Sequence, residues 1–215
     1  MNAPSRPSVA TLYIVRHGST AANKQRYAGW DDEPLDDAGR AEAERLAVRL
    51  ADRRIDAIYA SPLSRARDTA LPLARRTGLT IDCRHDLIEM NFGELQGMSK
   101  AASTMRIRKS HLHVAIPGGE SLADVALRAE RFLNELRPRL VTGSTLVLVS
   151  HFWTCRVLLG LLLGRRIDDM FAAPDYKPST GSVLQVNCTI AGTGEFVVHD
   201  RNPIASDAAT HEVPS

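Results

Sequence analysis

The sequence predicts an α/β fold built on a largely parallel sheet, and three observations lead to this prediction. Strand-like apolar runs alternate along the chain with segments of helical periodicity, which is the pattern of repeated βαβ units. Two of these runs, residues 12–15 and 146–149, are apolar at every position, as expected for strands that helices cover on both faces. The chain has 215 residues, of which 44% are hydrophobic, and this suffices for one domain with a large core.

The first half of the chain contains three predicted strands, at residues 11–16, 56–61 and 80–83. A helix begins after the first strand, where either Asp36 or Asp37 can cap its amino end. Its small and apolar side chains recur at helical spacing, at Ala43, Leu46, Ala47 and Leu50. A second helix is predicted over residues 64–77, and Gly78 ends it.

The second half begins with an irregular segment, within which we expect a lid insertion at about residues 90–118. Ser121 and Asp124 have the spacing of a capping box and open a helix with a buried stripe, formed by Val125, Ala129, Phe132, Leu133 and Leu136. A strand that ends at His151 follows, and then an apolar helix that reaches Gly164. Two late strands, residues 182–187 and 195–198, are joined by a glycine-rich turn and are interpreted as antiparallel edges.

The ends of the chain differ from the part between them. We expect a flexible amino terminus over residues 1–10, a single domain over residues 11–200 and a flexible tail over residues 201–215. The amino terminus lacks the apolar segment of a signal peptide. The longest apolar stretch, residues 157–163, is far shorter than the roughly 20 residues of a membrane-spanning helix.

Charge and cysteine content narrow the classes of function. The chain has 27 Lys and Arg against 25 Asp and Glu, and a net charge of +2 disfavours a polybasic surface for nucleic acid or anionic lipid. The three cysteines, Cys83, Cys155 and Cys188, show no paired spacing, which favours free thiols in a reducing compartment. We therefore expect a cytoplasmic protein that binds neither nucleic acid nor membrane.

Polar, titratable residues follow two of the buried strands at the point where each strand ends. Arg16 and His17 end the first strand, and His151 ends the late one. Because ligands of an open α/β sheet bind outside the carboxyl ends of its parallel strands, these exits suggest one shared site. Arg65, at the start of the second helix, is expected to point to the same rim. Arginine forks suit a phosphoryl dianion, and a neutral imidazole among them can attack phosphorus.

These residues belong to a longer set of motifs that resembles the histidine phosphatase superfamily, the phosphoglycerate-mutase-like group. The resemblance spans about residues 11–190 and rests on Arg16-His17-Gly18, Asn23, Gly29-Trp30, Pro34-Leu35, Gly39, Ser61-Pro62-Leu63-Ser64-Arg65-Ala66, Glu89, Phe92-Gly93, Gly118-Gly119-Glu120-Ser121 and Ser150-His151. It implies a three-layer α/β/α sandwich, with a mostly parallel central sheet and an antiparallel edge strand, and a covalent phosphohistidine at His17.

The resemblance also implies roles for the surrounding residues. Arg16, Arg65 and His151 would surround the phosphoryl group, and Asn23 would assist. Glu89 would give a proton to the leaving oxygen and then act as the base that activates water. The expected catalytic residues are His17, Glu89, His151, Arg16 and Arg65, and the expected phosphate- or substrate-binding residues are Arg16, Asn23, Gly29, Arg65, His151 and Lys100.

Within the superfamily, the segment after Glu89 separates the candidate activities. Phosphoglycerate mutases carry a longer insertion there, with a tyrosine just after the acid, whereas this insertion is short and has Phe92 in that place. Lys100 nevertheless resembles the mutase lysine, and residues 27–31 resemble α-ribazole and broad-specificity phosphatases. We predict a phosphomonoesterase that acts on a small phosphorylated metabolite. Mutase-type phosphoryl transfer and a non-catalytic phosphoanion-binding module are the alternatives.

We predict no cofactor and no catalytic metal. His111 and His113 alternate as on a strand, but no cysteine or carboxylate stands at ligand spacing, so we interpret them as lid residues. The basic side chains at 106, 108 and 109 (Arg106, Arg108 and Lys109) would make the lid cationic. The sequence is compatible with a homodimer as well as with a monomer.

Three aromatic residues complete the expectations. Trp30 and Trp153 are interpreted as packing groups, because only 5% of the chain is aromatic and no basic stripe surrounds them. Phe152 follows His151, where the superfamily usually has glycine. Its ring either narrows the pocket or turns into the core, and both outcomes are compatible with the sequence.

Overall fold

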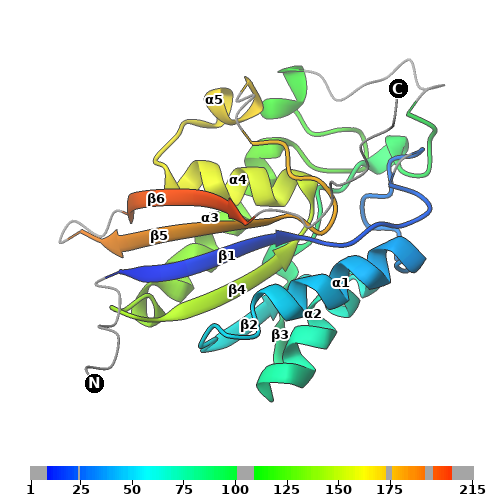
Figure 1. Cartoon of the computed structure of the whole chain (residues 1–215). Coiled ribbons are helices and arrows are strands. Elements are labelled where there is room, and N and C mark those ends of the chain that lie inside the picture. Colours follow the sequence, from blue (N-terminus) through cyan, green and yellow to red (C-terminus); the bar gives the residue numbers. More distant parts are fainter. Residues whose placement is uncertain (1–8, 24, 101–108, 173–175, 192–195, 205–215) are drawn as a thin grey trace, which may run out of the picture.

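A mixed sheet forms the centre of the computed structural model, which describes residues 9–23, 25–100, 109–172, 176–191 and 196–204 (Figure 1). In the described part of the chain, the sheet has six strands in the order β3-β2-β4-β1-β5-β6. Their bounds are β1 (Ala10–Arg16), β2 (Ala57–Ala60), β3 (Ile81–Cys83), β4 (Thr145–Ser150), β5 (Val183–Ile190) and β6 (Phe196–Ile204).

Helices cover both faces of this sheet (Figure 1). One face carries α1 (Asp37–Arg49) and α2 (Ser64–Thr77), and the other carries α3 (Leu122–Leu136) and α4 (Phe152–Leu162). The short helix α5 (Ile167–Ala172) follows α4 and had no counterpart in the sequence prediction. Single turns of 3-10 helix lie at His85–Leu87 (η1), Gly93–Leu95 (η2), Lys109–Leu112 (η3) and Arg137–Arg139 (η4). The predicted three-layer α/β/α sandwich is confirmed.

The strand directions agree with a mostly parallel sheet that has an antiparallel edge. The pairs β1–β4, β2–β4 and β2–β3 are parallel, whereas β5 runs antiparallel to β1 and β6 runs antiparallel to β5. β6 continues to Ile204, which pairs with Val183, so residues 201–204 belong to the sheet and not to the tail in which we placed them. Pairing with β5 extends the strand beyond its local apolar pattern. Residues 1–8 and 205–215, most of the two segments predicted to be flexible, lie outside the described residues.

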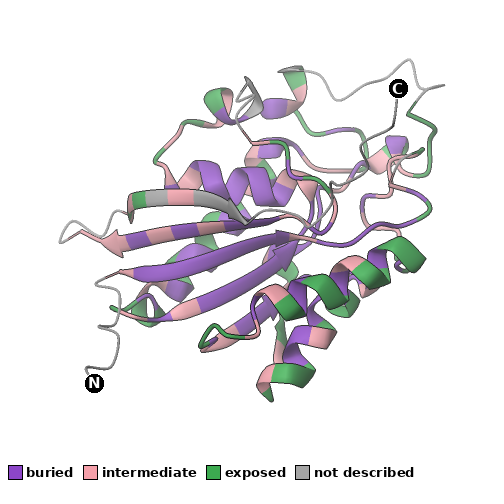
Figure 2. Cartoon of the chain, in the orientation of Figure 1, coloured by how far each residue is buried: buried purple, intermediate pink, exposed green. Residues whose placement is uncertain are grey.

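The continuous apolar character of β1 follows from its position between two helical layers. Leu12 and Ile14 pack in the cluster that includes α3 and α4, whereas Tyr13 and Val15 pack in the cluster that includes α1 and α2. Successive side chains of a strand point to opposite faces, so every position of this strand before Arg16 is buried (Figure 2).

Three predicted helix ends are confirmed, whereas α4 ends at Leu162, two residues before the predicted Gly164. The Asp36 side chain accepts a hydrogen bond from the Gly39 amide and caps α1. Ser121 forms the capping box of α3 with Asp124, and Gly78 ends α2 in the left-handed conformation, with φ of 71°. Among the described residues, no helix combines the length and the apolar composition that crossing a bilayer requires.

The register of the parallel strands brings three polar residues to one edge of the sheet. Arg16 at the end of β1 pairs with Ser150 at the end of β4, and the end of β2 lies on the other side of β4. His17, Ser61 and His151 each follow directly after one of these strands. The edge of the sheet at which β1, β2 and β4 end is therefore the place where the candidate site is built.

Candidate active site

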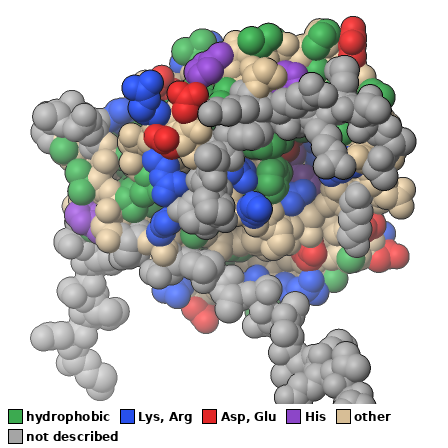
Figure 3. Space-filling view, turned by 90° about the horizontal axis from the view of Figure 1, so that it is seen from above, with side chains coloured by type: hydrophobic (Ala, Val, Ile, Leu, Met, Phe, Trp, Pro, Cys, Tyr) green, Lys and Arg blue, Asp and Glu red, His purple; other side chains and the backbone are tan. Residues whose placement is uncertain are grey.

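A pocket of about 500 Å³ contains seven of the predicted site residues. Cationic, imidazole, carboxyl and aromatic side chains line it together with four small or polar residues. The lining residues are Arg16, His17, Thr20, Asn23, Arg26, Tyr27, Ala28, Gly29, Arg65, Glu89, Phe92, Lys100, Phe152 and Trp153. His151 is fully buried beside it, with its ring centroid 5.0 Å from that of His17. Lys and Arg side chains also lie among hydrophobic ones on the face that Figure 3 shows. The pocket thus combines positive charge with apolar surface.

His17 is held as a neutral imidazole of defined tautomer. Its Nδ1 lies 2.7 Å from the Gly18 carbonyl oxygen, and because a carbonyl only accepts, Nδ1 carries the proton. Burial lowers the pKa of His17 well below its usual range, and the nearby Arg65 and Arg16 lower it further. The Nε2 lone pair is therefore available as a nucleophile.

Gly18 is required by a close backbone approach. A Cβ atom at this position would lie 2.6 Å from the carbonyl oxygen of Gly39 in the first turn of α1. The Gly18 amide also donates to the Thr69 hydroxyl of α2 at 2.9 Å. Gly18 thus allows the end of β1 to pack closely against α1 and α2.

His151 presents a second buried imidazole. The Leu63 amide donates to the Ser61 hydroxyl at 3.3 Å, and this hydroxyl lies 2.7 Å from His151 Nε2. When the Ser61 hydroxyl donates its proton to Nε2, Nδ1 carries the proton of the neutral ring. Nδ1 has no hydrogen-bond partner among the described residues, so it is a buried donor left unpaired beside the pocket. Burial, then Arg65 and His17, hold the pKa of His151 well below its usual range.

Two arginines bring positive charge to His17. Arg65 is almost fully buried and donates to the carbonyl oxygens of Gly29 and Asp31 at 2.6 and 2.7 Å. Arg16 donates to the Pro178 carbonyl at 2.8 Å, and its Nε has no partner in the described part of the chain. Since backbone carbonyls hold both guanidinium groups in place, their charge is left to attract an anion.

Glu89 is the carboxyl group of the pocket. Its Oε1 accepts hydrogen bonds from the amides of Met90 at 2.9 Å and Trp153 at 3.2 Å, the latter in the first turn of α4. Burial raises the pKa of Glu89, against the opposing effects of the Met90 amide and of Arg16 and Arg65. A raised pKa keeps a proton on this carboxyl closer to neutral pH, as a general acid requires.

The remaining predicted binding residues have different positions. Asn23 lines the pocket, and its backbone carbonyl oxygen accepts a hydrogen bond from Lys100 Nζ at 2.7 Å. Burial, and then Arg16, lower the pKa of Lys100. Gly29 lines the pocket, and its carbonyl holds Arg65. In this structure Gly29 therefore positions Arg65 through its backbone carbonyl.

The histidines of the predicted lid lie away from the pocket. His113 contacts Asp168 of α5, with 3.2 Å between Nε2 and Oδ1, and neither His111 nor His113 lines the pocket. Within the described ranges, no group of three or more His, Cys, Asp or Glu is arranged to hold a metal ion. The side chains of Arg106, Arg108 and Lys109 lie outside the described residues.

Two aromatic expectations are resolved. Phe152 lines the pocket, and Trp153 does so as well, so the interpretation of Trp153 as a packing group was incomplete. Trp30 donates from its indole nitrogen to the Glu89 carbonyl at 2.7 Å. Low aromatic content predicts the average environment of a ring, and it does not locate the few rings that face a site.

Comparison with known proteins identifies the family. The chain matches the histidine phosphatase superfamily (branch 1) over residues 12–193. The chain belongs to this superfamily. The sequence expectation of a histidine phosphatase is therefore confirmed.

Relatives of this histidine phosphatase carry both mutase and phosphatase names. A 2,3-bisphosphoglycerate-dependent phosphoglycerate mutase 2 of Gloeobacter violaceus is 35% identical over 163 residues, which cover 70% of this chain and 74% of the mutase. Phosphoserine phosphatase 1 of Hydrogenobacter thermophilus is 36% identical over 161 residues, covering 71% of this chain and 75% of that protein. The chain spans 46% of the length of a 34% identical bifunctional protein of Mycobacterium tuberculosis.

A solved structure supports the same assignment. A mycobacterial glucosyl-3-phosphoglycerate phosphatase superposes with a TM-score of 0.79 at 29% identity, covering 89% of this chain and 97% of the other. The fold of this histidine phosphatase is therefore shared over nearly the whole of both chains.

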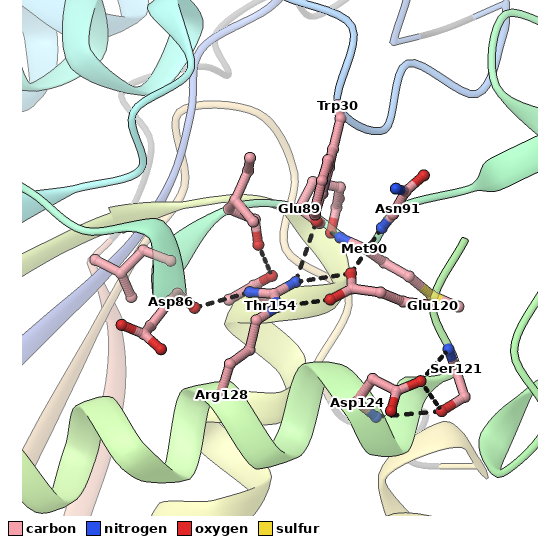
Figure 4. A network of polar contacts seen from close by, with 12 residues as sticks. Trp30, Asp86, Glu89, Met90, Asn91, Glu120, Ser121, Asp124, Arg128 and Thr154 are labelled. Atoms are coloured by element: carbon pink, nitrogen blue, oxygen red, sulfur yellow. Dashed lines mark hydrogen bonds and ion pairs between the residues drawn. The ribbon is translucent and has the colours of Figure 1, made fainter. Parts of the chain in front are cut away.

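A buried arginine that the sequence prediction missed holds the Glu89 segment in place. Arg128 of α3 donates to the carbonyl oxygens of Asp86 at 2.8 Å and Glu89 at 3.1 Å, and it forms an ion pair with Glu120 at 3.1 Å (Figure 4). Glu120 in turn accepts from the Asn91 amide at 2.8 Å. The segment that carries Glu89 is thus tied to α3 on both sides of the acid.

Side chains from the other flanking elements complete this anchoring. The hydroxyl of Ser150 donates to the Leu87 carbonyl at 2.7 Å, and that of Thr154 donates to the Ile88 carbonyl at 2.6 Å. The four consecutive backbone carbonyls of residues 86–89 therefore all accept hydrogen bonds from side chains, which replaces the pairing that a strand or helix would supply. A charged residue on the apolar stripe of the predicted α3 helix, between Val125 and Phe132, was the available signal for Arg128.

Replacing Arg128 is expected to destabilise the protein. Arg128→Met removes the cation that pairs with the partly buried Glu120 carboxylate and the donor to the Asp86 and Glu89 carbonyls, so we expect the free energy of unfolding to fall by about 2–4 kcal/mol. Arg131→Met is the matched control on the same helix, because Arg131 pairs with Asp86 at an exposed site and should contribute at most about 1 kcal/mol. Urea unfolding measures both. Equal effects of the two changes would contradict the structural role of Arg128.

Proposed function

We propose that this protein is a phosphomonoesterase that releases inorganic phosphate from a small phosphorylated metabolite through a phosphohistidine at His17, without a metal or an organic cofactor. One observation carries the proposal. A neutral imidazole with its Nδ1 proton bound to the Gly18 carbonyl lines a pocket together with two arginines and a buried carboxyl group. This combination provides a nucleophile, a charge for the phosphoryl oxygens and a proton donor in one cavity.

In the first step, His17 Nε2 attacks phosphorus. The new N–P bond forms as the P–O bond to the substrate breaks, and the electron pair remains on the leaving oxygen. Glu89 gives its proton to that oxygen, for which its raised pKa prepares it. Arg16, Arg65 and the free Nδ1 of His151 are the donors that would stabilise the three phosphoryl oxygens.

In the second step, water replaces the imidazole. The Glu89 carboxylate takes a proton from the water as its oxygen attacks phosphorus, and the N–P bond breaks with return of the electron pair to His17. Inorganic phosphate leaves, and Glu89 is again protonated. The same carboxyl group thus acts as acid and then as base, and both steps balance in atoms and charge.

Structural relatives that bind phosphate or a phosphate-like anion support the proposed chemistry. The mycobacterial glucosyl-3-phosphoglycerate phosphatase has been solved with VO3, at a TM-score of 0.78 and 29% identity, and with inorganic phosphate. Phosphoserine phosphatase 1 of Hydrogenobacter thermophilus is a further phosphatase among the relatives. We extend to this chain only the shared chemistry, which is cleavage of a phosphomonoester.

Mutase-type phosphoryl transfer is the second candidate. It is favoured by the mutase names of several relatives and by Lys100, which lines the pocket where the superfamily resemblance places a mutase lysine. The shortness of the segment after Glu89 and the absence of a hydroxyl at Phe92 favour hydrolysis.

A phosphate-release assay tests the proposed function. Purified protein, with EDTA present throughout, is expected to release one phosphate per ester from para-nitrophenyl phosphate and from members of a panel of metabolite monoesters. Isomerisation of 3-phosphoglycerate that outpaces phosphate release would assign the protein to the mutases. Stoichiometric binding of phosphate without cleavage of any ester would assign it to non-catalytic phosphoanion binding.

We also propose that the protein works in the cytoplasm. Cys155 and Cys188 are buried free thiols and Cys83 is an exposed one, which suits a reducing compartment. The net charge of +2 is compatible with a small metabolite as the principal partner, without a role for nucleic acid.

A further inference from the structure

Four of the residues that line the pocket are aromatic. Tyr27, Phe92, Phe152 and Trp153 all line the cavity, although aromatic residues make up only 5% of the chain. They come from three places in the sequence, namely the loop after β1, the segment after Glu89 and the first turn of α4. The gathering of so few rings around one cavity indicates that they contribute to substrate binding.

The four rings form two fixed pairs. Tyr27 and Phe92 meet edge to face with their centroids 5.3 Å apart, and Phe152 and Trp153 do the same at 5.3 Å. Edge-to-face packing restrains each ring at little further entropic cost. The pocket therefore presents ring surfaces that are already ordered before a ligand binds.

Phe152 links this aromatic wall to the phosphoryl end of the pocket. The Arg16 guanidinium carbon lies 5.3 Å from the centroid of the Phe152 ring, and that of Arg156 lies 5.6 Å from it. Cations at these distances orient the ring through its quadrupole. Because Arg16 is also proposed to bind the phosphoryl oxygens, the Phe152 ring lies next to whatever group is esterified to phosphate.

The other cations of the pocket are less suited to a second anion. Arg26 forms an ion pair with Glu33, which offsets its charge. Lys100 donates to the Asn23 carbonyl, and its ammonium lies 5.9 Å from the centroid of the Tyr27 ring. Beyond Arg16 and Arg65, the cavity thus offers more ring surface than free positive charge.

We propose that the site selects phosphomonoesters in which an apolar aromatic ring stands close to the phosphate, and that Phe152 is a specificity-determining residue for this class. The inference rests on the proposed phosphomonoesterase activity and adds the substrate class to it. Ring-on-ring packing and the exclusion of water from the ring provide the selectivity.

Benzyl phosphate and ethyl phosphate test this selectivity, because both release a primary alcohol and differ mainly in the ring. We expect kcat/KM for benzyl phosphate to exceed that for ethyl phosphate by about 10- to 100-fold. Phe152→Ala should reduce this ratio about tenfold, and Phe152→Leu, which keeps apolar bulk without the ring, should give an intermediate ratio.

Two results would overturn the inference while the proposed function stands. One is cleavage of both esters by the unaltered protein at similar kcat/KM. The other is an equal loss for both esters in Phe152→Ala, which would show that the ring only holds Arg16. Absence of any ester cleavage would remove the proposed function itself. In that case the dissociation constants of benzylphosphonate and ethylphosphonate decide the ring preference, and equal values overturn it.

Discussion

Replacing His17 with asparagine is expected to reduce turnover of every phosphomonoester by at least about a thousandfold. Asparagine retains a polar side chain of similar reach, but its amide nitrogen has no lone pair that can attack phosphorus. The loss should be independent of the leaving group, because no phosphoenzyme forms with any ester. Steady-state kinetics and acid-labile labelling of the protein by a radioactive phosphoryl donor measure the two consequences.

His113→Asn is the matched control for this change. His113 is an exposed histidine that contacts Asp168 and does not line the pocket. Its replacement should leave turnover and labelling unchanged. Labelling of the His17→Asn protein at the level of the unaltered one would place the phosphohistidine elsewhere and end the proposed mechanism.

The same variant has a second, thermodynamic signature. The unfolded chain protonates His17 near its ordinary pKa of about 6.5, whereas the folded protein holds that pKa well lower, chiefly through burial. The corresponding stability is present above the unfolded pKa and is lost as the pH falls through the folded one. His17→Asn should therefore weaken the fall in stability below pH 6.5 by up to about 1.4 kcal/mol per pH unit. Urea unfolding at several pH values measures this slope, to which His151 contributes with the same sign.

Replacing Glu89 with glutamine is expected to slow esters of basic alcohols by about 10²- to 10⁴-fold, and para-nitrophenyl phosphate by much less. A poor leaving oxygen needs the Glu89 proton, whereas nitrophenolate leaves without it. A plot of log kcat/KM against the pKa of the leaving group should therefore be steeper for the variant. Equal losses along the series would remove Glu89 from the role of acid.

The pH dependence of Glu89→Gln sharpens this test. A general acid must be protonated, so kcat/KM of the unaltered protein should fall as the pH rises through the raised pKa of Glu89. This fall in kcat/KM with rising pH should be absent in Glu89→Gln. Glu94→Gln is the matched control, because Glu94 is an exposed carboxylate five residues further along the same segment and does not line the pocket.

The order and type of most elements could be predicted from local patterns. Capping residues such as Asp36 and Ser121 bond to backbone amides only three residues away, so the helix starts they determine can be predicted from the sequence. The last strand, predicted at residues 195–198, is longer in the structure because β6 gains residues 199–204 by pairing with β5, which is a contact between segments joined through a turn. Helix α5 was missed, since its six residues carry too little periodic pattern to detect.

The chemistry of the site was predicted in part. His17 and His151 stood out because titratable residues follow the ends of two buried strands, and the parallel register then requires them to lie at one edge. Arg128 was passed over, because an arginine on an apolar helix stripe has meaning only once its acceptors, the carbonyls of Asp86 and Glu89, are known. The direction of the Phe152 ring depended on Arg16 and Arg156 in the same way.

By itself, the sequence determined the fold class, the strand exits that carry the two histidines and the superfamily, because each of these depends on residues close together or on their order along the chain. Only the tertiary structure decided the burial of His17 and Glu89, which sets the direction of their pKa shifts, and the identity of the groups around them. Desolvation and hydrogen bonding arise from atoms that folding brings together from distant positions. The aromatic wall of the pocket is such a property, and no local pattern contains it.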